Sequence, residues 1–353
     1  MQTTYLIAAG GTAGHVVPAL AVADALRTDG AKVVFVGGGR AEADLVPRAG
    51  YEFHQLDLEG IDRQNLFSAL RAAAKAAVAV VQAWKIIGKL KPAAVLGGGG
   101  YVAGPVGVAT VLRRVPLVIT EADSHFGLTN RLLAPWAKRV CLAFPLAGRS
   151  GERYLLTGRP IPPAADDREA ARELFGLTAD DDVIVVVGGS LGADSINRAA
   201  IAAFGSQVGI KVIHAAGASH LEELEQVPRS DGYQLFGYLD SFAEALLAAD
   251  IVVSRSGGSV SEIAAAGRPA ILVPFPAAAG DHQAGNARWM ADAGAAIVIA
   301  DRDLTAQRLS AEVARLFSDR ADLAAMASAS LSIARPDATA AVANELRTAG
   351  GRR

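Results

Sequence analysis

The chain has 353 residues, about half of them apolar, which is too long for one compact α/β unit and apolar enough to bury two hydrophobic cores. Its 34 basic and 36 acidic side chains leave a net charge of -2, so no overall positive field favours a nucleic acid partner. The single cysteine, Cys141, excludes an intrachain disulfide and a thiolate-cluster zinc site, and we expect it to be a small buried apolar residue.

The first expected element is a strand over residues 5–9, which leads through Gly10-Gly11-Thr12-Ala13-Gly14 into a helical pattern over residues 16–23. The residues before this strand lack a basic n-region, so we expect no signal peptide and a cytoplasmic chain. His15 closes the glycine loop at the helix N-terminus, where the helix dipole favours a neutral imidazole. Such a ring could accept a proton from a substrate hydroxyl, and a purely structural histidine is the alternative.

The most apolar long stretch, residues 66–90, is interrupted by charged side chains and therefore should not cross a bilayer. Its apolar residues recur at near-helical spacing between basic ones: Phe67, Leu70, Val78, Val81, Trp84 and Ile87 among Arg71, Lys75, Lys85, Lys89 and Lys91. Trp136-Ala137-Lys138-Arg139 forms a second aromatic and basic cluster. These residues predict a surface for an anionic membrane, and a helix that packs its apolar face inward is the alternative.

Further buried strands are expected after helical stretches, at residues 32–36, 93–96, 116–120, 182–187, 211–214, 250–254 and 269–273. This alternation predicts two doubly wound α/β domains with parallel sheets. The Pro-, Gly- and Asp-rich segment 157–167 interrupts the pattern, so we place the boundary near residue 160. The domains are then residues 1–160 and 161–353, and the helices expected from about residue 320 to 348 could pack on either one.

Glycine clusters follow the carboxyl ends of three expected strands, where open parallel sheets bind their ligands. Gly97-Gly98-Gly99-Gly100 before Tyr101 predicts contact with a phosphate-bearing ligand, or else close packing of a helix on a strand. Gly188-Gly189-Ser190-Leu191-Gly192 repeats the strand, loop and helix order of the N-terminus and offers bare amides to a diphosphate. It matches neither GxGxxG nor a P-loop, and a tight turn is the alternative.

Polar residues follow two later strands in the second half. Ser259-x-x-Glu262, after Arg255-Ser256-Gly257-Gly258, fits a capping box, but the Glu262 carboxylate could instead accept hydrogen bonds from a ribose diol. Asp281-His282-Gln283 supplies paired donors and acceptors for sugar hydroxyls; the alternative is an N-cap at Asp281 with a solvated His282. Asp180-Asp181-Asp182 precedes its strand and so lies at the opposite edge, where we expect a solvated turn and no required metal.

These motifs, in this order and over nearly the whole chain, resemble the undecaprenyl-diphospho-muramoylpentapeptide β-N-acetylglucosaminyltransferases, the MurG family. The likeness is carried by the glycine loops at 10–15, 98–105 and 188–193, by Gly127-Leu128-Thr129-Asn130, by the segment from Ser254 to Glu262, and by Asp281-His282-Gln283 with Asn286. Two segments depart from the family pattern: Thr120-Glu121-Ala122-Asp123 stands for His-Glu-Gln-Asn, and Arg159-Pro160-Ile161-Pro162 for Asn-Pro-x-Arg. The exact acceptor and sugar therefore stay open.

The resemblance implies a GT-B architecture of glycosyltransferase family 28, with two Rossmann-like domains facing a cleft, the acceptor on the N-terminal domain and the donor on the C-terminal one. It implies inverting, metal-independent transfer of N-acetylglucosamine from UDP-GlcNAc to the lipid-linked muramoyl-pentapeptide (lipid I to lipid II) of peptidoglycan synthesis. The implied partners are the UDP-sugar, a polyprenyl-diphosphate-linked acceptor and the inner face of the bacterial cell membrane, without a cofactor or nucleic acid.

On this basis we assign site residues in three groups. The catalytic candidates are His15 and Glu121. The donor-binding candidates are Thr12, Gly14, Asp123, Arg159, Gly189, Ser190, Leu191, Gly192, Ser256, Gly257, Glu262, Asp281, His282 and Gln283. The acceptor-binding candidates are Gly11, Gly99, Gly100, Tyr101 and Asn130. Alternative functions are a related GT-B enzyme with another UDP-sugar or acceptor, a UDP-GlcNAc epimerase, and a non-catalytic nucleotide-sugar-binding subunit.

Overall fold

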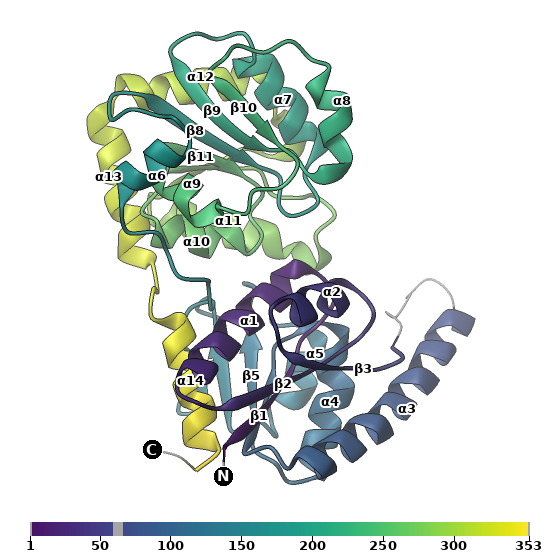
Figure 1. Ribbon diagram of the computed structural model, residues 1–353. Helices are drawn as coiled ribbons and strands as arrows, with labels where there is room; N and C mark the ends of the chain where they lie inside the picture. The colour runs from purple at the N-terminus through teal and green to yellow at the C-terminus, as the bar shows by residue number, and fades with distance from the viewer. Residues whose placement is uncertain (1, 59–65, 352–353) are drawn as a thin grey trace. The chain divides into compact units, whose positions relative to one another are not determined.

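The computed structural model describes residues 2–58 and 66–351, with the backbone alone described over 66–73. It divides into two compact units, Met1–Pro162 with Pro336–Arg353, and Pro163–Arg335. Each unit contains one parallel sheet with helices on both faces (Figure 1), so the predicted fold class of two Rossmann-like α/β domains is confirmed.

The first unit contains a seven-stranded sheet in the order β3-β2-β1-β4-β5-β6-β7, all pairs parallel. Its strands are β1 Thr4–Ala8, β2 Lys32–Gly37, β3 Glu52–Gln55, β4 Ala94–Gly97, β5 Leu117–Glu121, β6 Arg139–Leu142 and β7 Tyr154–Leu156. Its helices are α1 Ala13–Thr28, α2 Ala41–Arg48, α3 Leu66–Leu90, α4 Gly100–Leu112, α5 Leu128–Leu133 and α14 Ala338–Ala349.

Side chains of β1 alternate between two cores, one on each face of this sheet. Tyr5 and Ile7 pack with apolar residues of α1 and α14, whereas Leu6 and Ala8 pack with those of α3 and α4. Cys141 in β6 is only 1% exposed in the first of these cores, which confirms the prediction of a buried small apolar residue. Helix α14 therefore completes the core of a unit whose other elements all lie before residue 157.

The second unit contains a six-stranded parallel sheet in the order β10-β9-β8-β11-β12-β13. Its strands are β8 Asp182–Val187, β9 Ile210–Ala215, β10 Tyr233–Phe236, β11 Ile251–Ser254, β12 Ala270–Leu272 and β13 Ala296–Val298. Its α-helices are α6 Arg168–Leu174, α7 Asp194–Phe204, α8 Leu221–Glu225, α9 Phe242–Ala248, α10 Ser259–Ala265, α11 His282–Asp292, α12 Ala306–Ser318 and α13 Arg320–Ile333. Short 3-10 turns lie at Ala218–His220, Ala279–Asp281 and Asp301–Asp303.

The observed strands match the predicted ones to within about one residue at each end, but five strands were not predicted. Four of them, β3, β7, β10 and β13, form the edges of the two sheets, and the fifth, β6, lies next to β7. An edge strand pairs on one side only and tolerates polar residues, as β3 does with the sequence Glu-Phe-His-Gln. Such strands lack the continuous apolar run that identifies the central ones.

Candidate functional site

The loops after β1, β4 and β5 lie at one edge of the first sheet, because these strands are parallel neighbours. This edge carries Gly11, Thr12, Gly14 and His15 after β1, Gly99, Gly100 and Tyr101 after β4, and Glu121, Asp123 and Asn130 at the end of β5 and beyond it. The structure thus brings the predicted acceptor-binding and catalytic residues of this unit to a single edge.

The glycines at this edge permit backbone contacts that no other residue would allow. A Cβ atom on Gly100 would lie 1.9 Å from the carbonyl oxygen of Gly10, and Gly99 and Gly100 both have left-handed φ angles of 92° and 75°. A Cβ on Gly99 would lie 2.7 Å from Cδ2 of His15. Close packing therefore explains these two glycines, and their contact with a phosphate-bearing ligand stays a prediction.

His15 is the third residue of α1 and is half-buried. Its backbone amide donates to the carbonyl of Thr12 at 3.0 Å, which places the ring in the first turn of the helix, against Gly99. The helix dipole favours a neutral ring at this position. The geometry therefore suits a proton acceptor at the ligand edge of the sheet.

Arg159 stabilises the first turns of α1 by donating a hydrogen bond to a backbone carbonyl that has no donor within the helix. Pro18 lies inside α1 and has no amide hydrogen, so the carbonyl of Gly14 lacks its helical donor. The guanidinium of Arg159 donates to this carbonyl and, at 2.9 Å, to the carbonyl of Ala122. Arg159 is only 6% exposed, so these contacts give it a structural function beside the predicted donor contact, which stays a prediction.

Glu121 closes the loop between β5 and α5. Its Oε2 accepts from the amide of Gly127 at 2.8 Å and from Nδ2 of Asn130 at 3.0 Å, and its Oε1 accepts from the amide of Asp123 at 3.4 Å. Burial raises the pKa of Glu121, and the hydrogen bonds from Gly127 and Asn130 partly oppose this. Both oxygens therefore hold the loop in place, which gives Glu121 a structural function, and its predicted catalytic role stays a prediction.

In the second unit, the loop after β8 is held tightly against the loop after β9. A Cβ on Gly192 would lie 1.9 Å from the carbonyl oxygen of Ala216, and Gly189 and Gly192 have φ angles of 89° and 79°. Ser190 and Leu191 are exposed, Leu191 by 79%. The loop is therefore a constrained turn with an exposed tip before the N-terminus of α7, an arrangement that can bind an anion.

A chain of hydrogen bonds between buried side chains holds the backbone of Ala216 in place. Nδ1 of His214 lies 2.7 Å from the hydroxyl of Tyr233, and its Nε2 lies 3.0 Å from Oδ1 of Asn197. Nδ2 of Asn197 donates to the carbonyl of Ala216 at 2.9 Å. Burial, with a smaller contribution from Arg229, lowers the pKa of His214 to about 3, so this ring is neutral at physiological pH.

Arg255 joins three loops at the carboxyl edge of the second sheet. Its guanidinium donates to the carbonyl of Val273 at 3.1 Å, to Oδ1 of Asp301 at 2.6 Å and to Oγ of Ser195 at 3.0 Å. Ser195 also donates to Asp301, at 2.7 Å. Burial alone would raise the pKa of Asp301, but the hydrogen bonds from Ser195 and Arg255 lower it. Asp301 is therefore an anion that fixes these loops.

The predicted sugar-binding residue Gln283 is oriented by its own loop. Its Oε1 accepts from the amide of Phe275 at 2.9 Å, and its backbone carbonyl accepts from the buried hydroxyl of Ser256 at 2.7 Å. Its Nε2 lies 3.8 Å from the position that a Cβ on Gly257 would occupy. The structure thus brings Ser256, Gly257 and Gln283 together, with the Gln283 amide nitrogen beside the glycine.

Ser259 does not take the N-cap position that the predicted capping box requires, and the choice between the two roles of Glu262 stays open. Helix α10 begins at Ser259 itself, and its N-cap is Gly258, which has no side chain to accept from the helix amides. Ser259 instead donates to the carbonyl of Arg255 at 3.3 Å. Asp281 does occupy the N-cap position of α11, but in a left-handed conformation and without a side-chain capping bond to the described backbone. His282 is half-buried, and its role stays a prediction.

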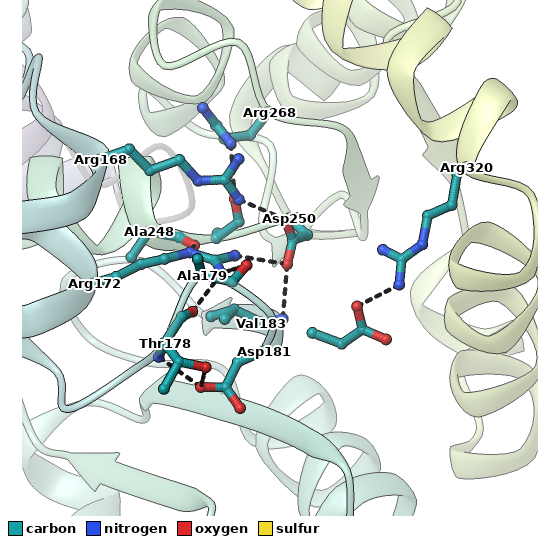
Figure 2. Close-up of polar contacts among 12 residues, drawn as sticks. Arg168, Arg172, Thr178, Ala179, Asp181, Val183, Ala248, Asp250, Arg268 and Arg320 are labelled. Atoms are coloured by element: carbon teal, nitrogen blue, oxygen red, sulfur yellow. Dashed lines mark hydrogen bonds and ion pairs between the residues drawn. The ribbon is translucent and has the colours of Figure 1, made fainter.

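The acidic triplet lies at the opposite edge of the second sheet, as predicted. Asp181 accepts from the amide and the hydroxyl of Thr178, and Asp182 pairs with Arg320 at 2.5 Å. Figure 2 shows this edge, where Arg168 and Arg172 converge on Asp250. Asp182 is therefore paired and not merely solvated. Within residues 2–58 and 66–351, no group of three or more His, Cys, Asp or Glu side chains is arranged to hold a metal.

Several residues that organise these loops were not predicted from the sequence. They are Glu42 in the first unit and Ser195, Asn197, His214, Tyr233 and Asp301 in the second. The sequence did contain one indication of Glu42, because Gly37-Gly38-Gly39, which begins at the last residue of β2, is a glycine cluster at the same edge as the others. The second group had no such signal, because its members contact one another only in the folded unit.

Comparison with known proteins gives matches for both units. Residues 5–142 match the model of the glycosyltransferase family 28 N-terminal domain, and residues 183–342 match that of its C-terminal domain. The chain is 38% identical, over 96% of its length and 96% of the relative, to the UDP-N-acetylglucosamine N-acetylmuramyl-(pentapeptide) pyrophosphoryl-undecaprenol N-acetylglucosamine transferase of Moorella thermoacetica.

Among solved structures, the chain is similar to MurG of Acinetobacter baumannii, with a TM-score of 0.78 and 30% identity over 99% of this chain and 100% of that one. It also shares its fold with a UDP-N-acetylglucosamine 2-epimerase, with a TM-score of 0.65 over 100% of this chain and 98% of that one. Identity to the epimerase is 14%, which supports a common fold alone.

The buried neutral His214 predicts a pH dependence of stability. Its pKa is about 3 in the folded chain and about 6.5 in an unfolded one, so the unfolded state binds more protons between these values. Its contribution to the free energy of unfolding should fall as pH falls below about 6.5, by up to about 1.4 kcal/mol per pH unit. His214→Gln should therefore show a shallower loss of stability than the parent in this window.

Urea unfolding at a series of pH values measures this difference. Replacing Trp84 and Trp136 by Phe leaves Trp289 as the fluorescent reporter of the second unit. An equal slope in the parent and in His214→Gln would contradict the assignment of a neutral buried ring.

Proposed function

The chain belongs to glycosyltransferase family 28, and we propose that it transfers N-acetylglucosamine from UDP-GlcNAc to a muramoyl-pentapeptide carried by diphosphate on undecaprenol. It is a glycosyltransferase, and the product, lipid II, is the lipid-linked precursor of peptidoglycan, on which cell shape and division depend. The observation that carries the proposal is the match over nearly the full length to relatives named for this transfer, together with glycine loops at the ligand edge of each sheet.

We assign the donor to the second unit. The amides of residues 188–193 and the N-terminus of α7 would bind its diphosphate, which carries the negative charge that such a terminus favours. Glu262, in the first turn of α10 at the same edge of the sheet, would accept from the ribose hydroxyls. The oriented amide of Gln283, with Asp281 and His282 beside it, would bind the sugar hydroxyls.

We assign the acceptor and the proton acceptor to the first unit. The acceptor hydroxyl oxygen attacks the anomeric carbon from the face opposite UDP, the bond from that carbon to the diphosphate breaks, and the hydroxyl proton passes to His15. UDP leaves as the anion. Because the loop amides and the dipole of α7 stabilise this charge, no metal ion is required in the proposal. The acidic triplet, at the far edge of its sheet, is in the wrong place to hold one.

We further propose that the first unit associates with the inner membrane surface. Large apolar side chains are exposed on three consecutive helices and the segment after them: Val78, Val81 and Trp84, Val108 and Leu112, Leu128 and Leu132, and Trp136. Ile87 is buried in the core, so its predicted place on this surface is wrong, and the side chains of Phe67, Leu70 and Arg71 lie outside the described residues. None of the described helices is both long and apolar enough to span a bilayer.

Basic residues flank this apolar surface. A groove of about 690 Å³ at the opposite edge from the glycine loops is lined by Trp136 together with Arg114, Lys138, Arg139 and Arg153. Arg113 stacks on the ring of Trp84, with its guanidinium carbon 3.3 Å from the ring centre. Exposed aromatic and aliphatic groups beside cations suit the interface of an anionic bilayer.

The departures at 120–123 and 159–162 keep another UDP-sugar or another acceptor as the second candidate. Residues 120–123 run from the end of β5 into the loop that Glu121 and Arg159 hold in place. The two remaining alternatives predict different assay results. An epimerase converts UDP-GlcNAc without an acceptor, whereas a non-catalytic binding subunit releases no UDP.

The first test measures UDP release by the purified chain with UDP-GlcNAc and the lipid-linked muramoyl-pentapeptide, with EDTA present throughout. We expect turnover that requires the acceptor and is faster with UDP-GlcNAc than with UDP-Glc, UDP-Gal or TDP-sugars. UDP-GlcNAc isomerisation without the acceptor would support the epimerase instead. Activity that appears only after magnesium or manganese replaces EDTA would contradict the metal-independent mechanism.

Glu262→Ala should weaken UDP-GlcNAc binding by a factor of ten or more and leave the melting temperature close to that of the parent. The reason is that Glu262 accepts hydrogen bonds from the ribose in the proposal, whereas a lost helix cap would cost only about 0.5–2 kcal/mol. Calorimetric titration and thermal unfolding of the same sample separate the two effects. Unchanged affinity with a sharp drop in melting temperature would exclude the ribose contact.

His15→Ala should lower kcat by about 10²–10⁴-fold, the range typical of general-base catalysis, at saturating concentrations of both substrates. Loss of a mere positioning contact would mainly raise the KM for the acceptor. The pH–rate profile should also lose the acidic limb that protonation of the ring produces. A variant with near-native kcat would rule out His15 as the base and make Asp123 the next candidate.

A further inference from the structure

Glu42, in the first turn of α2, is a fully buried carboxylate at the ligand edge of the first unit. It is 0% exposed. Three glycines leave the space for its side chain: a Cβ on Gly10 or Gly37 would lie 2.6 Å from Glu42 atoms, and one on Gly38 would lie 3.0 Å from its Oε1. A buried charge is costly unless hydrogen bonds satisfy it, so its partners indicate why it is there.

The partners of Glu42 come from three different loops. Its Oε2 accepts from the amide of Gly11 at 2.8 Å, in the loop after β1. Its Oε1 accepts from the amide of Gly38 at 2.9 Å, after β2, and from the hydroxyl of Tyr101 at 3.0 Å, at the start of α4. One carboxylate thus ties the loops after β2, β1 and β4, which are consecutive strands in the sheet.

Tyr101 is held as a hydrogen-bond donor in this arrangement. Burial and then the Glu42 carboxylate raise the pKa of Tyr101 to about 12, so its hydroxyl stays protonated at physiological pH. Arg40 stacks over the ring, with its guanidinium carbon 5.0 Å from the ring centre. The ring is therefore fixed at both its face and its hydroxyl.

These contacts constrain the segment that leads into His15. The Gly11 amide already donates to Glu42, so it is not available to a ligand, and the position of this peptide is set by the carboxylate. At the other end of this segment, directly before His15, Arg159 holds the carbonyl of Gly14. The residues from Gly11 to Gly14 are thus anchored at both ends by buried charged side chains.

We propose that Glu42 is a positioning residue for the transfer reaction, which fixes the loop after β1 and the Tyr101 hydroxyl so that His15 meets the acceptor hydroxyl in reacting geometry. The inference rests on the proposed function for its kinetic consequence, whereas the anchoring of the loop does not depend on the identity of the acceptor. A displacement of about 1 Å at a reacting group can cost on the order of 100-fold in rate.

Glu42→Gln tests this proposal because the side chain keeps its shape and loses one acceptor oxygen. If the amide oxygen stays with Gly38 and Tyr101, the amide NH₂ faces the N–H of Gly11, and two donors meet. We expect kcat to fall by about 10–100-fold at saturating substrates and the KM for UDP-GlcNAc to stay within about twofold. Hydrogen–deuterium exchange of the peptide covering residues 9–15 should become faster.

Val46→Ala is the matched control, because Val46 is fully buried on the same helix α2 but packs in the core away from the loops. It should lower thermal stability as much as Glu42→Gln or more, with kcat and exchange of residues 9–15 close to those of the parent. Equal kinetic losses in both variants, or near-parent kcat in Glu42→Gln, would overturn the proposal.

Two further outcomes are decided by the same measurements. Should Glu42→Gln fail to fold, Glu42→Asp keeps the charge but is one carbon too short to reach both amides, and it should show the same selective gain in exchange and loss of kcat. If the parent does not use the muramoyl-pentapeptide acceptor, the proposed function fails, but unchanged exchange of residues 9–15 in the Glu42 variant would still overturn the positioning role separately.

Discussion

The central constraint on both units is the approach of one backbone loop to another without room for a Cβ atom. Gly100 lies over the carbonyl of Gly10 in the first unit, and Gly192 lies over that of Ala216 in the second, each with only 1.9 Å for an added Cβ. Parallel strands deliver their carboxyl ends to one edge, and glycine lets the loops there pack against one another. Main-chain amides and helix N-termini are thereby concentrated where a phosphate-bearing ligand can reach them.

Buried polar side chains then hold these glycine loops, which have little side-chain packing of their own. In the first unit Glu42 and Arg159 hold the loop after β1, and Glu121 holds the loop after β5. In the second unit Arg255 with Asp301, and separately the chain from Tyr233 through His214 and Asn197, do the same. Satisfied polar networks of this kind specify one arrangement, because each group would be costly to bury without its partner. The two units thus reach similar loops through different sets of side chains.

The sequence was sufficient for the central strands and for the positions of the glycine loops, because long apolar runs and glycine clusters are local signals. It was insufficient to predict the edge strands, whose polar residues interrupt the apolar run, or the side chains that hold the glycine loops by hydrogen bonds. Glu42 and Tyr101 are 59 residues apart, and Arg159 and Gly14 are 145 apart, so only the fold brings them together. One local motif was also misleading, since Ser259-x-x-Glu262 has the spacing of a capping box but the helix begins one residue too early, with Ser259 inside it and Gly258 as the N-cap.

The return of the last helix to the first unit has a consequence for biosynthesis and for dissection of the protein. Val342, Ala343 and Leu346 of α14 are fully buried against residues of β1 and α1. During synthesis, this part of the core of the first unit therefore stays uncovered until the whole second unit has been translated. The first unit, whose translation begins first, can complete its fold only after the second unit has been made. A fragment that ends at the unit boundary would expose the same apolar face. To produce the first unit alone with its complete core, residues 336–353 would have to be joined to residues 1–162 through a linker.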